Sequence, residues 1–200
     1  VSELVVDPRS WAYCNTAGVN QTREFLAAQV NARGGVQVTP DEINFYNGLG
    51  DAVAKVYGFL RREARILGPS PAYSTHSSAE AAHSGYDHFT YRLDPRNGWM
   101  PDMDEIRQKA AYNDSVAGIL LLSPDNPTGA VYPPEILAEF AEIAREFDLF
   151  IIADEIYSNI VYNGTEPLHL SEWIGETPAL AMKGISKEYP WPGSRCGWLE

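Results

Sequence analysis

Continuous apolar segments alternate along the chain with segments whose apolar residues recur at helical spacing. The pattern predicts strands over residues 43–46, 88–93, 116–122, 149–153 and 179–182. It predicts helices over residues 20–33, 51–64 and 133–147, the last opened by two prolines. Strands such as 116–122 are apolar at nearly every position, which is typical of a sheet covered on both faces. We therefore expect an α/β fold with a mostly parallel central sheet and helices on both faces. The segment 93–101 is predicted to be a loop.

Composition and charge narrow the class of protein. The 200 residues, of which 44% are hydrophobic, suffice for one substantial core, and the longest apolar stretch, around residues 119–122, is far too short to span a membrane. A formal net charge of -12 argues against nucleic-acid binding and gives no affinity for anionic membranes. The two cysteines and four histidines show neither a disulfide framework nor the spacing of metal ligands. We expect a cytoplasmic protein without a metal and without nucleic-acid or membrane partners.

The first candidate for chemistry is Lys187. The predicted strand 179–182 delivers it into a turn-rich loop that also carries Arg195. This is the layout of a Schiff-base lysine with a phosphate partner, because a buried amine beside a cation stays nucleophilic enough to attack an aldehyde cofactor. Taken alone, the segment also fits a lysine and an arginine in an ordinary surface loop.

Polar side chains also follow two of the predicted strands. Asn126 stands in a Pro- and Gly-rich turn after strand 116–122, and Asp154 and Tyr157 follow strand 149–153. In open α/β sheets the carboxyl ends of the strands meet at one edge, where ligands bind. We therefore expect these three side chains to lie at the same edge of the sheet.

In this order along the chain, Asn126, Asp154, Tyr157, Lys187 and Arg195 resemble the aspartate aminotransferase superfamily, the class I/II aminotransferases with the type I fold of pyridoxal phosphate enzymes. The resemblance implies pyridoxal 5'-phosphate as the cofactor, bound to Lys187 as an internal aldimine. It implies that Asp154 pairs with the pyridine nitrogen and that Asn126 and Tyr157 contact the phenolic oxygen. Arg195 would bind the phosphate.

Three upstream segments extend the resemblance. Leu49 and Gly50 stand in the place of the family's glycine-rich turn, which opens a helix whose N–H groups hold the phosphate. Tyr73 falls where the family has an aromatic residue stacked on the pyridine ring. Tyr13 resembles the tyrosine that reaches the cofactor phosphate of a partner subunit, which implies a homodimer; its alternative is ordinary interface packing.

Two glycines depart from the family's pattern. Gly50 and Gly184 stand where many members have hydroxyl residues, so two donors to the phosphate are lost, each worth on the order of 1 kcal/mol. The contact of Arg195 is charge-assisted and stronger, so phosphate binding should survive in weakened form. Ser186 either supplies one donor or points into the sheet.

The expected function follows from the roles that the resemblance implies. Asp154 keeps the ring nitrogen protonated, so that negative charge at the substrate Cα can flow into the ring. Lys187 then carries the proton between Cα and the cofactor. We expect an aminotransferase that moves an amino group between an amino acid and a 2-oxo acid. The alternatives are a C–S lyase or decarboxylase of the same fold, and a non-catalytic regulatory cofactor-binding domain.

The family is about twice the length of this chain. The resemblance therefore implies that residues 1–200 are the cofactor-binding large domain, truncated at both ends, with the small domain mostly absent. Family members bind the substrate carboxylate with an arginine of the small domain, so the residues in hand do not identify the substrate.

Overall fold

The computed structural model describes residue 3 and residues 6–200, and in that part of the chain no helix is long and apolar enough to cross a membrane. Helices and strands alternate along it. The α-helices are α2 (Asn20–Ala32), α3 (Leu49–Phe59), α4 (Ser74–Ser84), α5 (Met103–Ala111), α6 (Pro134–Glu146) and α7 (Leu170–Trp173). The strands are β1 (Asn44–Asn47), β2 (Arg65–Ser70), β3 (Thr90–Asp94), β4 (Met100–Pro101), β5 (Val116–Leu122), β6 (Phe150–Asp154), β7 (Ala179–Gly184) and β8 (Cys196–Leu199). Short 3-10 helices are η1 (Pro8–Trp11), η2 (Pro40–Glu42), η3 (Pro95–Asn97) and η4 (Pro192–Ser194).

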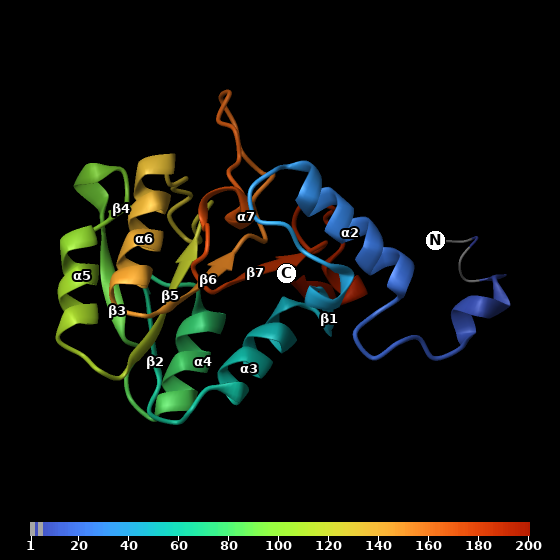
Figure 1. The fold of residues 1–200 in the computed structure, drawn as a ribbon, viewed down its shortest axis with the longest axis horizontal. Helices are drawn as coiled ribbons and strands as arrows, with labels where there is room; N and C mark the ends of the chain where they lie inside the picture. The colour runs from blue at the N-terminus through green and yellow to red at the C-terminus, as the bar shows by residue number, and fades with distance from the viewer. Residues whose placement is uncertain (1–2, 4–5) are drawn as a thin grey trace.

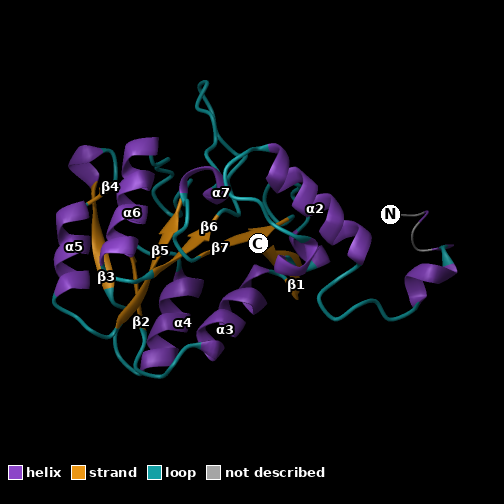
Figure 2. Ribbon diagram, viewed as in Figure 1, coloured by secondary structure: helices purple, strands orange, loops and turns teal. Residues whose placement is uncertain are grey.

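The strands of the described residues form one eight-stranded sheet in the order β1-β8-β7-β6-β5-β2-β3-β4 (Figure 2). The inner strands β3, β2, β5, β6 and β7 run parallel, and antiparallel pairs close both edges. From β2 the chain runs outward to β3 and then returns to place β5 on the other side of β2. Ligands bind beside the carboxyl ends of strands at such a reversal. The predicted α/β class is confirmed.

Helices cover both faces of the sheet. Along β5, Ile119 and Leu121 pack into the core under α5, α6 and α7, whereas Leu120 and Leu122 pack into the core under α3. In Figure 1, α3 and α4 lie below the sheet, and α5 and α6 lie at the left of the view, on the opposite face. A strand buried on both faces needs apolar residues at consecutive positions, which is why this segment is apolar without alternation.

The helix predicted over residues 51–64 differs from the structure. Helix α3 begins at Leu49 and ends at Phe59, because Leu60 adopts extended backbone (φ −71°, ψ 149°) and the chain turns back toward β2. Helices α4, α5 and α7 and strand β2 were not predicted. In α4 the buried positions are polar, namely His76, Glu80 and Ser84, so an apolar period is absent. Strand β2 is short and contains Gly and Pro.

The predicted loop over residues 93–101 is a tight hairpin. Leu93 pairs with Pro101 and Asp94 with Met100, on either side of η3. The Asp94 carboxylate accepts a hydrogen bond from the backbone N–H of Arg96 at 2.9 Å and thereby caps this turn. The segment is therefore an edge of the sheet, with polar turn residues that the sequence pattern could not distinguish from a loop.

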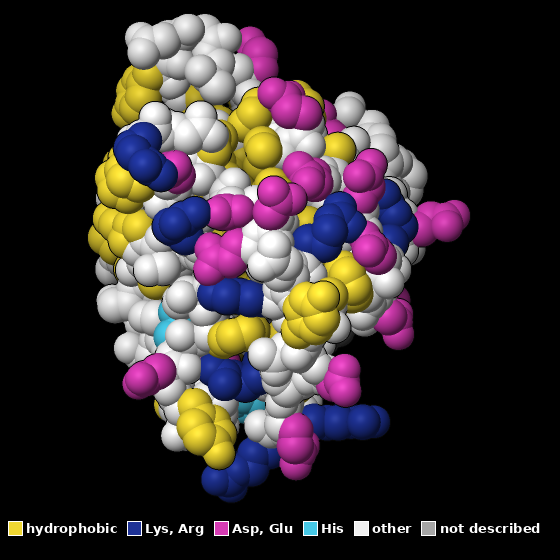
Figure 3. Space-filling view, turned by 90° about the vertical axis from the view of Figure 1, so that its left-hand side faces the viewer, with side chains coloured by type: hydrophobic (Ala, Val, Ile, Leu, Met, Phe, Trp, Pro, Cys, Tyr) yellow, Lys and Arg dark blue, Asp and Glu magenta, His cyan; other side chains and the backbone are white. Residues whose placement is uncertain are grey.

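The outer face beside this hairpin carries acidic and basic side chains interspersed with one another (Figure 3). Ion pairs join Arg92 to Asp102 at 2.5 Å and Lys109 to Glu105 at 2.7 Å. The net negative charge of the chain is therefore not gathered into a single acidic field on this face.

Candidate active site

A pocket of about 250 Å³ opens beside the carboxyl ends of β2, β5, β6 and β7 and the first turn of α3. It brings together residues that are far apart in the sequence. Of the predicted site residues, Leu49, Gly50, Tyr73, Asp154, Tyr157, Ser186, Lys187 and Arg195 line it. Four further lining residues that sequence reasoning did not single out, Val53, Thr75, Leu122 and Ile156, complete its wall, together with Pro192 from the lysine loop.

Asp154 forms the buried end of the pocket. It is the last residue of β6 and is only 2% exposed. Its Oδ1 accepts the backbone N–H of Ile156 at 3.1 Å, and its Oδ2 lies 2.8 Å from Nε2 of His76. These contacts fix the carboxylate in one orientation at the edge of the sheet.

The contact of His76 with Asp154 is one that sequence reasoning missed. Four histidines scattered along the chain offered no ligand spacing, and only the fold brings this one onto Asp154. The sequence did contain one indication, because His76 comes three residues after Tyr73, which is the spacing of one helical turn. In the structure the two rings meet edge to face, with their centroids 6.1 Å apart. Its other ring nitrogen, Nδ1, is buried without a hydrogen-bond partner among the described residues.

Asn126 and Tyr157 meet across the ends of β5 and β6. The Asn126 side-chain amide donates to the Tyr157 hydroxyl at 3.4 Å. Asn126 lines an adjoining pocket of about 440 Å³, which shares Tyr157 with the first. The turn that carries Asn126 is fixed by Asp125, whose Oδ2 accepts the Thr128 hydroxyl at 2.5 Å. Burial raises the pKa of the Asp125 carboxyl. Asn126 and Tyr157 thus lie close together at the carboxyl ends of β5 and β6.

The lining of the pocket also includes the first turn of α3 and the guanidinium of Arg195. Gly48 caps α3 with a φ of +79°, and a Cβ there would lie 2.1 Å from Nη2 of Arg195. A Cβ on Gly197 would lie 2.8 Å from the backbone nitrogen of Leu49. Glycine at position 48 adopts the positive φ and leaves room for the guanidinium, and glycine at position 197 lets β8 approach the start of α3. Helix N–H groups and an arginine at one point form a phosphate-binding arrangement.

Lys187 lies at the mouth of the pocket. Its Nζ is 5.7 Å from the ring centroid of Tyr157, and Ser186 lines the same pocket. The amine of Lys187 was expected to be buried, and this was wrong for residues 1–200, in which the Lys187 side chain is exposed. It stands in the loop beyond Gly184, the last residue of β7, where the sheet and its helices do not cover it.

Tyr13 lies outside the pocket of its own chain. Its side chain is fully exposed, and the segment that carries it extends away from the sheet (Figure 1). The role at a partner subunit's phosphate remains a prediction.

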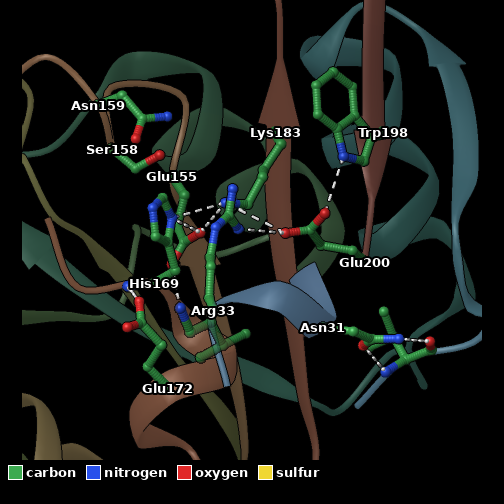
Figure 4. Close-up of polar contacts among 12 residues, drawn as sticks. Asn31, Arg33, Glu155, Ser158, Asn159, His169, Glu172, Lys183, Trp198 and Glu200 are labelled. Carbon is green, nitrogen blue, oxygen red and sulfur yellow. Dashed lines mark hydrogen bonds and ion pairs between the residues drawn. The ribbon is translucent and has the colours of Figure 1, made fainter. Parts of the chain in front are cut away.

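A second lysine, Lys183, is buried on β7 and has a different environment (Figure 4). Its Nζ lies 2.6 Å from Oε2 of Glu155, 3.0 Å from Nδ1 of His169 and 3.3 Å from Oε1 of Glu200. Burial alone would raise the pKa of Glu155, but Lys183 and His169 outweigh it and lower that pKa to about 2. Lys183 is therefore held in a buried ion pair, which leaves Lys187 as the amine that faces the pocket.

The arrangement fits the phosphorylated pyridine aldehyde that the sequence implied. The carboxylate of Asp154, the guanidinium of Arg195, the amine of Lys187 and the phenol of Tyr157 all line one pocket, beside the first turn of α3. Among residue 3 and residues 6–200, no group of three His, Cys, Asp or Glu side chains is placed to hold a metal ion.

Comparisons with known proteins agree with this geometry. Residues 8–199 match the family described as Aminotransferase class I and II. The chain is 58% identical over 200 residues to an uncharacterized aminotransferase of Methanocaldococcus jannaschii, covering 100% of this chain and 46% of the relative. It is 34% identical to the glutamate-pyruvate aminotransferase of Escherichia coli K12, covering 98% of this chain and 49% of that protein.

A solved structure shows the same fold. The crystal structure of an aminotransferase from Escherichia coli superimposes with a TM-score of 0.91 at 33% identity, over 100% of this chain and 50% of that one. The chain thus spans about half the length of the curated relatives it matches.

Proposed function

The chain belongs to the class I and II aminotransferases, and on that premise we propose that the whole protein is a pyridoxal phosphate-dependent transaminase. It moves an amino group between an amino acid and a 2-oxo acid. The observation that carries the proposal is the single pocket that joins a buried carboxylate, Asp154, an anion site at Arg195 and the amine of Lys187.

We propose that residues 1–200 form the cofactor-binding large domain of this enzyme. The relatives are about twice as long, so the remaining half would supply the small domain and its site for the substrate carboxylate. The working form in this proposal is a cytoplasmic homodimer, in which Tyr13 of one chain serves the phosphate site of the other. The full exposure of Tyr13 in its own chain supports that role.

The residues that would hold the cofactor divide by the group they contact. Leu49, Gly50, Ser186 and Arg195, which line the pocket, would hold the phosphate. Asp154 would pair with the ring nitrogen, Tyr73 would stack on the ring, and Asn126 with Tyr157 would bind the phenolic oxygen. The Gly48 and Gly197 positions support the phosphate end, because side chains there would collide with Arg195 and with the start of α3.

When bound, the cofactor supplies an electron sink for the negative charge that develops at the substrate Cα. Asp154 would stabilise a protonated ring nitrogen as an opposite charge. His76, with Nε2 2.8 Å from Oδ2 of Asp154, would keep that carboxylate in its orientation. The Lys187 amine would accept the proton from the substrate Cα and donate it again as the general acid. Tyr157 and Asn126 would hold the phenolic oxygen.

The names of the relatives favour transamination over the other reactions considered. Both curated relatives described above are aminotransferases, whereas a C–S lyase, a decarboxylase and a non-catalytic regulatory domain share only the ring contacts. Among those alternatives none has an observation in its favour.

Borohydride reduction of the full-length protein with pyridoxal phosphate, followed by peptide mapping, tests the proposal. The label should fall on Lys187, and Lys187→Ala should lose both label and turnover while keeping its unfolding transition. Lys55→Ala, an exposed lysine of α3, is the matched control and should keep both. A label on Lys183 or on another lysine would overturn the assignment. Glutamate with pyruvate is the first substrate pair to assay, because the E. coli relative is named for it.

A further inference from the structure

The Nζ of Lys187 lies 5.7 Å from the ring centroid of Tyr157, yet no strand pairing fixes the distance between these two residues. The pairing of β6 with β7 ends at Asp154 and Met182, and both functional side chains lie beyond that point. Tyr157 stands in a turn after β6, and Lys187 stands in the loop after β7. Something other than the strand ladder must join the turn to the loop.

Glu188, the residue directly after the lysine, makes this connection. Its Oε1 accepts the Ser158 hydroxyl at 3.1 Å and the backbone N–H of Asn159 at 3.0 Å. Its Oε2 accepts the side-chain amide of Asn159 at 2.8 Å. The donors are the two residues directly after Tyr157. Of residues 186–190, all within the described part of the chain, Glu188 is the one whose side chain hydrogen-bonds to this turn.

The same turn is also fixed at its other end. The backbone N–H of Glu155 donates to the carbonyl of Met182 at 2.9 Å, and its carboxylate pairs with Lys183 at 2.6 Å (Figure 4). The turn that carries Tyr157 is thus bonded to residues 182–188 both before and after the tyrosine. The Glu188 contact lies on the side of the reactive amine.

We propose that Glu188 is a positioning residue, whose carboxylate clamps the turn at Ser158 and Asn159 and so holds the Lys187 amine beside Tyr157. This inference rests on the proposed function of Lys187. Hydrogen bonds to an ionised carboxylate are among the stronger ones in proteins, and three of them on one side chain give a rigid connection. Rigidity matters here because misplacing a reacting group by about 1 Å can cost on the order of 100-fold in rate.

The clamp can be separated from a simple charge effect. Glu188→Ala removes both the carboxylate and the clamp. Asn159→Ala removes the Nδ2 donor and leaves the charge beside Lys187. Glu188→Gln removes the charge and keeps an oxygen that can accept from Asn159. Glu63→Ala, an exposed glutamate between α3 and β2, is the matched control.

Two readouts are measured on full-length, cofactor-free protein. The first is the rate at which added pyridoxal phosphate becomes attached to Lys187, followed by absorbance. The second is amide hydrogen exchange over residues 185–195, which needs no cofactor. Glu188→Ala should slow attachment by about tenfold or more and speed exchange in that segment. Asn159→Ala should shift both in the same direction, Glu188→Gln should fall between Glu188→Ala and the parent, and Asn159→Ala combined with Glu188→Ala should be no slower than Glu188→Ala alone.

The clamp is refuted if Glu188→Gln matches Glu188→Ala while Asn159→Ala matches the parent, because the effect would then come from charge. Parent-like attachment and exchange in all three variants would refute it as well. If the parent itself attaches no cofactor to Lys187, the proposed function fails. The exchange measurement still decides the clamp in that case, because it reports on the loop directly.

Discussion

Replacement of Lys183 by methionine tests the buried ion pair beneath the active site. Methionine has a similar unbranched shape, so the change removes the charge with little change of packing volume. It leaves Glu155, which is 5% exposed, with the backbone N–H of Leu170 at 2.5 Å and with His169 as its remaining partners. The variant therefore has an ionised carboxylate in the core without its main counter-charge.

The expected cost is about 3 kcal/mol of unfolding free energy at pH 7. Burial raises the pKa of Glu155, and Lys183 is the largest of the contacts that lower it to about 2, so the ionised carboxylate depends on Lys183. Breaking a buried ion pair by removing one partner costs about 3–5 kcal/mol in general, which sets the magnitude. Glu155→Gln combined with Lys183→Met should recover part of the loss, because the Glu155 charge is gone. Glu200 still loses Lys183 in this variant but keeps Arg33 at 4.0 Å and the indole N–H of Trp198.

The pH dependence has a definite sign. Because the pKa of Glu155 is lowered in the folded state, its contribution to stability is present above about pH 4.5 and is lost as the pH falls toward 2. The difference between parent and Lys183→Met should therefore be largest near neutral pH and shrink below pH 4.5.

Urea unfolding of the full-length protein at pH 7, 5 and 3 measures these differences. Lys109→Met is the control, because Lys109 pairs with Glu105 at 2.7 Å on the surface, with both side chains about 30% exposed. Its loss should cost at most about 1 kcal/mol. The reasoning fails if Lys183→Met costs no more than this control at pH 7, or if its cost does not change with pH.

Three further predictions concern the cofactor site. Asp154→Asn should lose far more kcat than melting temperature, because the amide can still bond to His76 but cannot keep the ring nitrogen protonated; wild-type turnover would contradict this assignment. Gly48→Ala should weaken pyridoxal phosphate binding about tenfold or more in a titration, because φ is +79° and the new Cβ collides with Arg195; unchanged affinity would show that the anion site lies elsewhere. Tyr13→Phe should weaken cofactor retention on dialysis by about tenfold or more, through one lost hydrogen bond to a charged group. Retention equal to the parent, or a fully active monomer, would exclude the cross-subunit role.

The sequence alone determined the α/β class and the edge of the sheet where the site lies. Strand β5 was predicted with its observed bounds, because a strand covered on both faces is apolar at every position. Asp154 and Asn126 could be placed together because each follows a strand of this kind, and parallel strands end at a common edge. These are local signals, and a pattern of a few residues suffices to carry them.

Only the tertiary structure decided which side chains meet. His76 reads as one scattered histidine until α4 packs against the sheet and brings it 2.8 Å from Asp154. Lys183 and Lys187 are equivalent as lysines near a strand end, yet one is buried in an ion pair and the other faces the pocket. Glu188 likewise meets a turn that lies about thirty residues earlier in the chain. Periodicity records which face of an element is buried, whereas the partner of a polar side chain depends on how separate elements pack, and no short stretch of sequence contains that information.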